Sequence, residues 1–251
     1  MRRLLLVSAA VWLLAGCGGD SSSDKQTAKS AQVPAEPTAT IRGCAPQCLQ
    51  PAYSEPGNVP KGTYTTQNFF AGQMRVLFDE GWAVGEDSTG EFASAATGNP
   101  DLRVIFWEDV HPTRHKKGLE RVTGAPGTAK DVVGWLRANP NLSVTKPRHG
   151  TIGSDLPATV IDVSVAAKAE NDDPGCPAKP CANFLGFPQW GEPYGIAGGG
   201  VTRFYLSDVK YGGKSHLLVA AVEGLDKAQL EAGLPAAERV IASAEVPAEP
   251  A

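Results

Sequence analysis

Five cysteines are the residues of this chain with the widest capacity for chemistry, and they fall into three groups. Cys17 follows an apolar segment, Cys44 and Cys48 have three residues between them, and Cys176 and Cys181 have four. A cysteine thiol can be acylated, oxidised to a disulfide or bound to a metal. The sequence around each group decides which of these is expected.

The residues before Cys17 indicate a secretory signal. Arg2 and Arg3 form a basic start, and residues 4–14 form an apolar run of eleven residues that only Ser8 interrupts. As a helix this run is about 16 Å long, roughly half the hydrocarbon core of a bilayer. The run is therefore expected to be a signal sequence and not a permanent span.

The motif Leu-Ala-Gly-Cys that ends at Cys17 resembles the lipobox of bacterial lipoproteins. The resemblance implies that the Cys17 thiol carries acyl chains such as palmitate and that residues 1–16 are cleaved off as a signal peptide. It also implies a place on the bacterial cell membrane, facing outside the cytoplasm, with the N-terminal lipid as the membrane contact. The alternative is a plain secreted protein whose signal ends at an ordinary small-residue cleavage site.

The other four cysteines are disulfide candidates, because an extracytoplasmic compartment is oxidising. Two local bridges, Cys44 to Cys48 and Cys176 to Cys181, are favoured by proximity. Two bridges that cross-link the pairs are the alternative and would stabilise the fold more. A zinc site of four thiolates needs reduced thiols and usually a two-residue spacing. We therefore predict no metal and no cofactor.

Three further patterns suggest chemistry without completing it. His111 and His115 have H-x3-H spacing but lack the glutamate of a zinc protease motif and have basic neighbours. Residues 170–173 cluster oxygen ligands that calcium could use but lack the spacing of a calcium loop. Ser215 and His216 are adjacent in an expected strand, so their side chains point to opposite faces. No catalytic residue is predicted.

Four aromatic residues precede a run of three glycines and form the one candidate ligand or partner loop. Aromatic side chains on a loop can line a pocket or contact a partner protein. The alternative is a loop that covers the protein's own core. The four residues are Phe184, Phe187, Trp190 and Tyr194.

Composition along the chain divides it into four parts. After the signal peptide (1–16), residues 17–61 are rich in serine and then in proline and have no hydrophobic periodicity. They are expected to form a flexible tether after the lipidated cysteine, although Cys44 and Cys48 leave open an arm packed on the domain. Residues 62–245 are expected to form one globular domain, and residues 246–251 a disordered tail.

Strand patterns dominate the expected domain. Residues 102–107 and 161–165 read as strands, and residues 201–210 and 215–223 form a hairpin around Gly212 and Gly213. Weaker strand patterns cover residues 74–78, 82–86, 91–95 and 142–146. Short connections between most strands favour antiparallel pairing.

Two helices are also expected. One begins after Thr128, which with Asp131 has the form of a capping box, and stops before Pro140. The other begins after Asp226 and runs through Pro235, which should kink or break it. The predicted fold class is α+β: a single domain with an antiparallel β-sheet flanked by two or more α-helices.

Four segments, in a fixed order, resemble poorly characterised bacterial extracytoplasmic domains, found as lipoproteins or outside membrane-bound kinases. The segments are residues 104–110, 132–139, 152–163 and 236–243. The resemblance implies a fold of the PsbP and LpqN type, an antiparallel sheet flanked by helices. Its motifs are packing patterns, so it supplies no site residues.

Composition limits the class of function. The 251 residues are 42% hydrophobic and 20% charged, which fits a soluble folded domain. A net charge of −4 gives no electrostatic reason to bind nucleic acid. The expected function is a lipid-anchored extracytoplasmic protein whose domain binds a small molecule or a cell-envelope protein without catalysis. The alternative is a cell-envelope hydrolase with an unrecognised active site.

Overall fold

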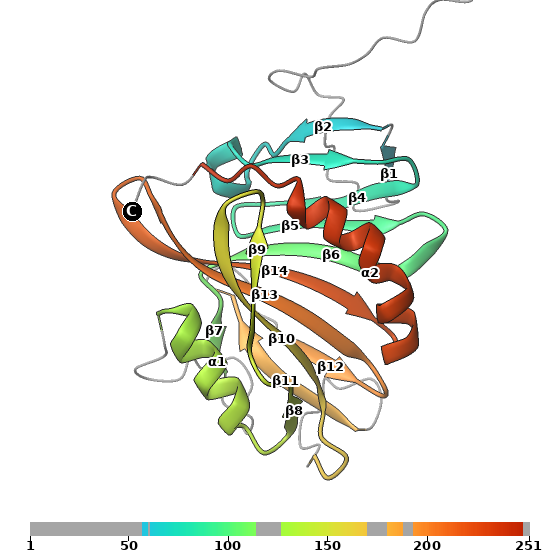
Figure 1. Ribbon diagram of the computed structural model, residues 1–251, viewed down its shortest axis with the longest axis vertical. Coiled ribbons are helices and arrows are strands. Elements are labelled where there is room, and N and C mark those ends of the chain that lie inside the picture. Colours follow the sequence, from blue (N-terminus) through green and yellow to red (C-terminus); the bar gives the residue numbers. More distant parts are fainter. Residues whose placement is uncertain (1–56, 60, 114–126, 170–179, 188–192, 248–251) are drawn as a thin grey trace, which may run out of the picture. The chain divides into compact units, whose positions relative to one another are not determined.

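The computed structural model describes residues 57–59, 61–113, 127–169, 180–187 and 193–247 (Figure 1). The signal peptide, Cys17 and almost all of the expected tether lie outside the described residues. No helix among the described residues is long and apolar enough to cross a membrane.

The described chain contains fourteen strands, one 3-10 helix and two α-helices. In chain order they are β1 (Gly57–Val59), β2 (Gly62–Thr65), η1 (Phe69–Gly72), β3 (Arg75–Phe78), β4 (Trp82–Asp87), β5 (Glu91–Ala96), β6 (Asn99–Glu108), β7 (His111–Pro112), α1 (Ala129–Ala138), β8 (Leu142–Val144), β9 (Arg148–Ile152), β10 (Leu156–Val165), β11 (Cys181–Gly186), β12 (Tyr194–Ala197), β13 (Val201–Tyr211), β14 (Lys214–Gly224) and α2 (Lys227–Ala242).

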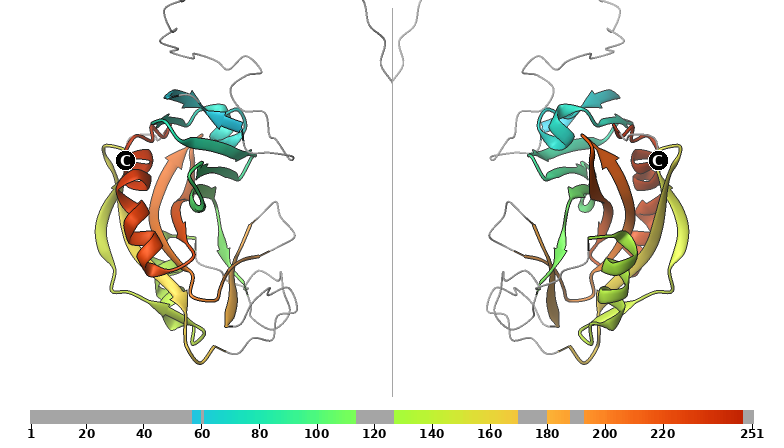
Figure 2. Two further views of the ribbon diagram at one scale, coloured as in Figure 1. Left: turned by 90° about the vertical axis from the view of Figure 1, so that its right-hand side faces the viewer. Right: turned by 90° about the vertical axis from the view of Figure 1, so that its left-hand side faces the viewer.

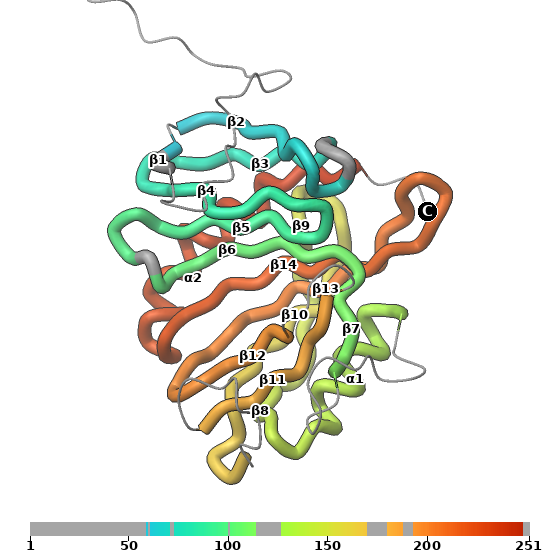
Figure 3. Tube along the Cα trace, turned by 180° about the vertical axis from the view of Figure 1, so that it is seen from behind, coloured from blue at the N-terminus to red at the C-terminus, as the bar shows by residue number. Residues whose placement is uncertain are grey.

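A nine-stranded antiparallel sheet forms the centre of the fold (Figures 1 and 3). Its strand order is β1-β4-β5-β6-β14-β13-β10-β8, with β9 paired to β10. A second sheet has the order β12-β11-β7, and β2 pairs with β3 in a separate hairpin. Because β1 pairs with β4, regular pairing begins at Gly57, before the predicted domain boundary at residue 62.

Both faces of the large sheet are buried. Strand β14 shows this most clearly: its residues 217–222 are all apolar and at most 2% exposed, and they alternate between two core clusters. The first cluster includes α2 and the β2–β3 hairpin, and the second includes α1 and strands β11 and β12. Figure 2 shows α2 and the β11–β12 strands on opposite sides of the large sheet.

The predicted fold class, a sheet flanked by two or more helices, was wrong. Strands hold 54% of the described residues and helices 18%, so the protein is predominantly β. Much of the cover that helices were expected to provide comes from strands instead. Segments expected to be loops, such as residues 181–186 and 194–197, pair with one another and close the second core cluster.

The local signals at the helix starts and the hairpin turn are confirmed. Thr128 Oγ1 accepts a hydrogen bond from the Asp131 amide at 3.3 Å, and Asp226 Oδ1 accepts one from the Gln229 amide at 2.8 Å. Gly212 and Gly213 have φ of 57° and 73°, as a tight hairpin turn between β13 and β14 requires. Pro235 lies inside α2 and does not end it.

Candidate functional site

The predicted aromatic segment forms strands at the positions that the structure describes. Phe184 lies in β11 and Phe187 just after it, and both are buried, while Tyr194 opens β12. The Trp107 ring centre lies 4.9 Å from that of Tyr194 and 5.3 Å from that of Phe187. Trp190 lies outside the described residues. This packing favours the alternative interpretation, in which these aromatics cover the protein's own core.

Tyr194 nevertheless lines a pocket, which we call the inter-sheet pocket because strands of both sheets line it. The pocket has a volume of about 310 Å³. Its lining comes from β6, β12, β13, β14 and the residues after β12 and β14. The lining residues used below are Arg103, Tyr194, Ile196, Val201, Thr202, Glu223 and Leu225.

Four polar residues of the inter-sheet pocket form two pairs. The Tyr194 hydroxyl lies 2.7 Å from Thr202 Oγ1, and Arg103 Nη1 lies 3.1 Å from Glu223 Oε2. Burial raises the pKa of Tyr194 well above its ordinary value, so its hydroxyl stays protonated. The pocket thus offers a phenol, a carboxylate and a guanidinium for hydrogen bonding to a ligand.

Apolar side chains complete the lining of the inter-sheet pocket. Ile196 is buried, whereas Leu225 is 61% exposed at the pocket rim. Leu77, at 44%, is the only other exposed large hydrophobic side chain among the described residues. Apolar walls with a few polar groups are typical of sites for small amphiphilic ligands.

The triple glycine of the sequence forms the turn that leads into this pocket. Gly198 has φ of 62°, a conformation that favours glycine. A Cβ atom at Gly200 would lie 3.1 Å from both the Ala197 carbonyl oxygen and Ile196 Cγ2. Glycine therefore allows β12 to turn tightly into β13 beside the pocket.

Glu91 is a buried ionisable residue that the sequence did not single out. It lies opposite Trp107 across the β5–β6 pair and is 4% exposed. Its Oε2 has no hydrogen-bond partner. Burial raises the pKa of this carboxyl to about 7, partly offset by the nearby Trp107 indole and by the charge of Arg103. The alternation of Glu91 with Ala93 in the expected strand was the available signal, because it places Glu91 on a core face.

Glu91 is expected to make stability fall as pH rises. A raised pKa means that the folded protein holds this proton more tightly than the unfolded chain does. The contribution of protonated Glu91 to the free energy of unfolding is therefore full below about pH 4.5 and is lost as the pH rises through about 7. The difference between the two ends of this range is about 3 kcal/mol. Urea unfolding of Glu91→Gln across this range should show a shallower decline than the parent protein.

The exposed Glu231 supplies the control for that measurement. Its side chain is 61% exposed and pairs with Lys227, so Glu231→Gln should leave the decline unchanged. Equal declines in Glu91→Gln and the parent protein would contradict the assignment of a raised pKa to Glu91.

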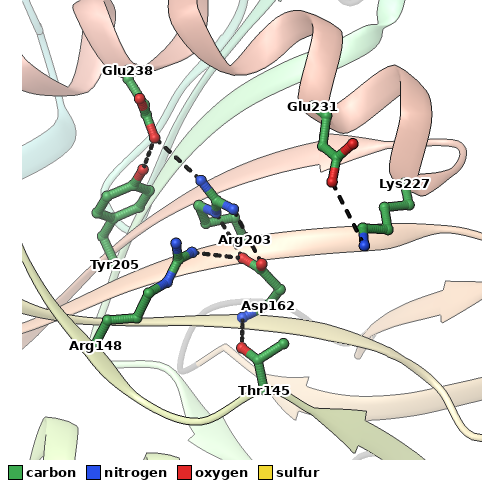
Figure 4. A network of polar contacts seen from close by, with 8 residues as sticks. All are labelled: Thr145, Arg148, Asp162, Arg203, Tyr205, Lys227, Glu231 and Glu238. Atoms are coloured by element: carbon green, nitrogen blue, oxygen red, sulfur yellow. Dashed lines mark hydrogen bonds and ion pairs between the residues drawn. The ribbon is translucent and has the colours of Figure 1, made fainter.

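A second pocket, of about 270 Å³, lies beside a network of charged residues (Figure 4). Arg203 donates from Nε and Nη2 to the two carboxylate oxygens of Asp162, at 2.6 and 3.1 Å. Its Nη1 donates to Glu238 Oε1 at 3.2 Å, and Glu238 also accepts from the Tyr205 hydroxyl at 2.9 Å. Arg148 adds a contact of 3.3 Å to Asp162.

The charged groups of this network form ion pairs with one another. The network joins β9, β10, β13 and α2, and its acidic and basic groups neutralise each other within it. We therefore interpret it as a structural clamp, and the inter-sheet pocket as the candidate ligand site.

The remaining residues singled out in the sequence do not form a common site. Cys181 opens β11 and is 1% exposed, but Cys44, Cys48 and Cys176 lie outside the described residues, so the disulfide pairing stays a prediction. His111 is buried in β7, 7% exposed. His115 and the acidic residues 170–173 also lie outside the described residues.

Ser215 and His216 are adjacent in β14, as expected. The His216 ring instead meets two acidic residues, Glu108 and Asp109, that the sequence did not connect with it. Within the described ranges, no serine, threonine or cysteine forms a hydrogen bond with this ring.

Comparisons with known proteins find solved structures that are similar to the chain at low sequence identity. No family model matches it, and no curated protein does. The solution structure of cyanobacterial PsbP (CyanoP) from Synechocystis sp. PCC 6803 is similar to it at 9% identity, with a TM-score of 0.38 over 76% of this chain and 94% of that one. A crystal structure from Bacteroides thetaiotaomicron VPI-5482 is similar at 12% identity, with a TM-score of 0.37 over 76% of this chain. The chain spans about half of that protein, 49% of its length.

Proposed function

We propose that this chain is a lipid-anchored extracytoplasmic protein whose domain binds a small amphiphilic ligand in the inter-sheet pocket without transforming it. The proposed location rests on the basic start, the apolar run and the lipobox-like motif at Cys17. The lipid would hold the domain at the bacterial cell membrane, outside the cytoplasm. A cell-envelope protein is the alternative partner.

The observation that carries the binding function is the composition of the inter-sheet pocket. Its volume of about 310 Å³ suits a small molecule, and it combines the Arg103–Glu223 ion pair with the apolar Ile196 and Val201. A ligand with an apolar body and one polar end could bury the first and hydrogen-bond through the second.

The competing proposal is a cell-envelope hydrolase. The observation in its favour is the His216 Nδ1, 2.8 Å from a carboxylate oxygen of Asp109, because such a pair orients a general base. It lacks a described nucleophile within hydrogen-bond reach of the ring. Turnover of any substrate in ester, peptide or glycan panels, lost on replacement of His216, would favour this alternative.

Leu225 provides the test of the inter-sheet pocket. A thermal-shift screen of the full chain in detergent, with amphiphilic acids, amines and short peptides, should find compounds that raise the unfolding midpoint. Leu225→Asp should abolish that shift, because it places a charge at the apolar rim. The side chain is 61% exposed, so the fold should survive the change.

Leu77→Asp is the matched control, since Leu77 is also exposed and is not among the pocket residues. It should retain the full ligand-induced shift. If no compound in the screen raises the unfolding midpoint, the proposed binding function is overturned. It is overturned as well if Leu225→Asp leaves the ligand-induced shift unchanged. If the chain specifically retains an envelope protein, and Leu225→Asp loses it while Leu77→Asp keeps it, the ligand of the pocket is a protein partner and not a small molecule.

A further inference from the structure

Two adjacent acidic residues meet a histidine where β6 ends beside β14. Glu108 is the last residue of β6 and pairs with Leu218 of β14. Asp109 then turns out of the strand, and its amide donates to the Leu217 carbonyl at 2.8 Å. Its Oδ1 accepts from the Leu217 amide at 2.9 Å, which leaves Oδ2 directed at His216. Both strands therefore hold the three side chains in place.

The three possible ligand atoms converge. His216 Nδ1 lies 2.9 Å from Glu108 Oε1 and 2.8 Å from Asp109 Oδ2. One ligand atom from each residue lies within 4.8 Å of the other two. The side chains of Glu108 and His216 are 17% and 16% exposed, whereas that of Asp109 is 44% exposed, so solvent reaches the cluster from one side. Among the described residues, no other three potential ligands converge in this way.

Hydrogen bonds from His216 alone do not satisfy both carboxylates of this cluster. A ring nitrogen carries at most one hydrogen, so Nδ1 cannot donate a full hydrogen bond to both carboxylates. The two carboxylates also repel each other. A dication would accept the nitrogen lone pair and both carboxylate oxygens and remove the repulsion.

We propose that Glu108, Asp109 and His216 form a binding site for a transition-metal dication, with zinc as the best chemical match. One imidazole nitrogen and two carboxylate oxygens are ligands that zinc accepts in proteins. Water would complete the coordination on the exposed side. The site uses none of the residues that line the inter-sheet pocket, so it stands independently of the proposed ligand.

Cobalt is the probe for the test, because its absorption reports the ligand type. The full chain in detergent, first treated with a chelator, is titrated with Co²⁺. We expect visible bands of nitrogen and oxygen ligation, without the near-ultraviolet charge-transfer band that a cysteine site would give, and displacement of cobalt by Zn²⁺. Zinc should also raise the unfolding midpoint.

Asp109→Asn and His216→Gln should each weaken this binding by at least about tenfold, because each removes a direct ligand. Asparagine tolerates the positive φ of 55° at position 109, so the first variant should keep the fold. His149→Gln is the control, since His149 is exposed on β9 away from the cluster, and it should bind like the parent protein.

Two results would overturn the metal site. Binding that is unchanged in both Asp109→Asn and His216→Gln would assign the cobalt signal to other residues. A protein that shows no cobalt bands and no zinc-dependent rise in unfolding midpoint would leave His216 as an ion-paired histidine only. Circular dichroism of each variant separates loss of binding from loss of fold.

Discussion

Replacement of Asp162 by alanine is expected to lower the free energy of unfolding by about 3 kcal/mol, because it leaves a half-buried guanidinium without its main partner. The Arg203 side chain is only 13% exposed, and two of its nitrogens donate to the Asp162 carboxylate (Figure 4). After the change Glu238, itself 48% exposed, would be the carboxylate that still contacts Arg203 among the described residues. Urea unfolding at neutral pH measures the loss.

Two control variants distinguish the effect of breaking the Asp162–Arg203 pair from the effect of removing any charge. Lys227 and Glu231, 3.6 Å apart, have side chains 79% and 61% exposed, so Glu231→Gln should change stability little. The double variant Asp162→Leu with Arg203→Met should lose much less than Asp162→Ala, because the two charges that then lack their partners, Arg148 and Glu238, are about half exposed to solvent. Equal stability of Asp162→Ala and the parent protein would show that solvent compensates Arg203 fully.

Elements with strong local signals were predictable from the sequence. The β13–β14 hairpin depends on Gly212 and Gly213, which supply the positive φ of its turn. The starts of α1 and α2 depend on the side chains of Thr128 and Asp226, whose oxygens accept backbone amides three residues on. Each of these features is decided within a few residues, so no knowledge of the tertiary fold was needed.

Strands without such signals were missed, and with them the balance between helix and sheet. Residues 194–197 have no strand pattern of their own and become β12 by pairing with β11. The aromatics on these strands then pack against Trp107 and Phe204 instead of lying on a loop. Pairing between distant segments depends on the tertiary structure, which local propensity does not encode.

Both unforeseen ionisable groups arise from strand register. Position 216 lies 107 residues from Asp109, and only the pairing of β6 with β14 brings His216 to the acidic pair. Strand alternation can place Glu91 on a core face, but it cannot show that Oε2 lacks a partner there. Chemistry that depends on register across a large sheet is therefore outside what spacing in the sequence can reveal.

Cys17→Ser is expected to abolish both acylation and removal of the signal peptide. Cleavage in the lipoprotein pathway implied by the lipobox resemblance follows modification of this thiol. Each acyl chain contributes about 0.8 kcal/mol per buried methylene group, so two or three chains anchor a protein stably. The variant would retain residues 1–16, and the apolar run 4–14 should hold it in the membrane only weakly.

Mass spectrometry of the membrane fraction decides between the anchor and a plain secreted protein. The native protein should begin at an acylated Cys17, whereas Cys17→Ser should retain residues 1–16 without lipid. Cys44→Ser is the control and should be acylated and cleaved like the parent. Because the described residues begin at Gly57, 40 residues after Cys17, the variant domain should fold unchanged, which circular dichroism can verify. An unmodified Cys17 in the native protein would refute the lipid anchor and leave a signal cleaved at an ordinary small-residue site.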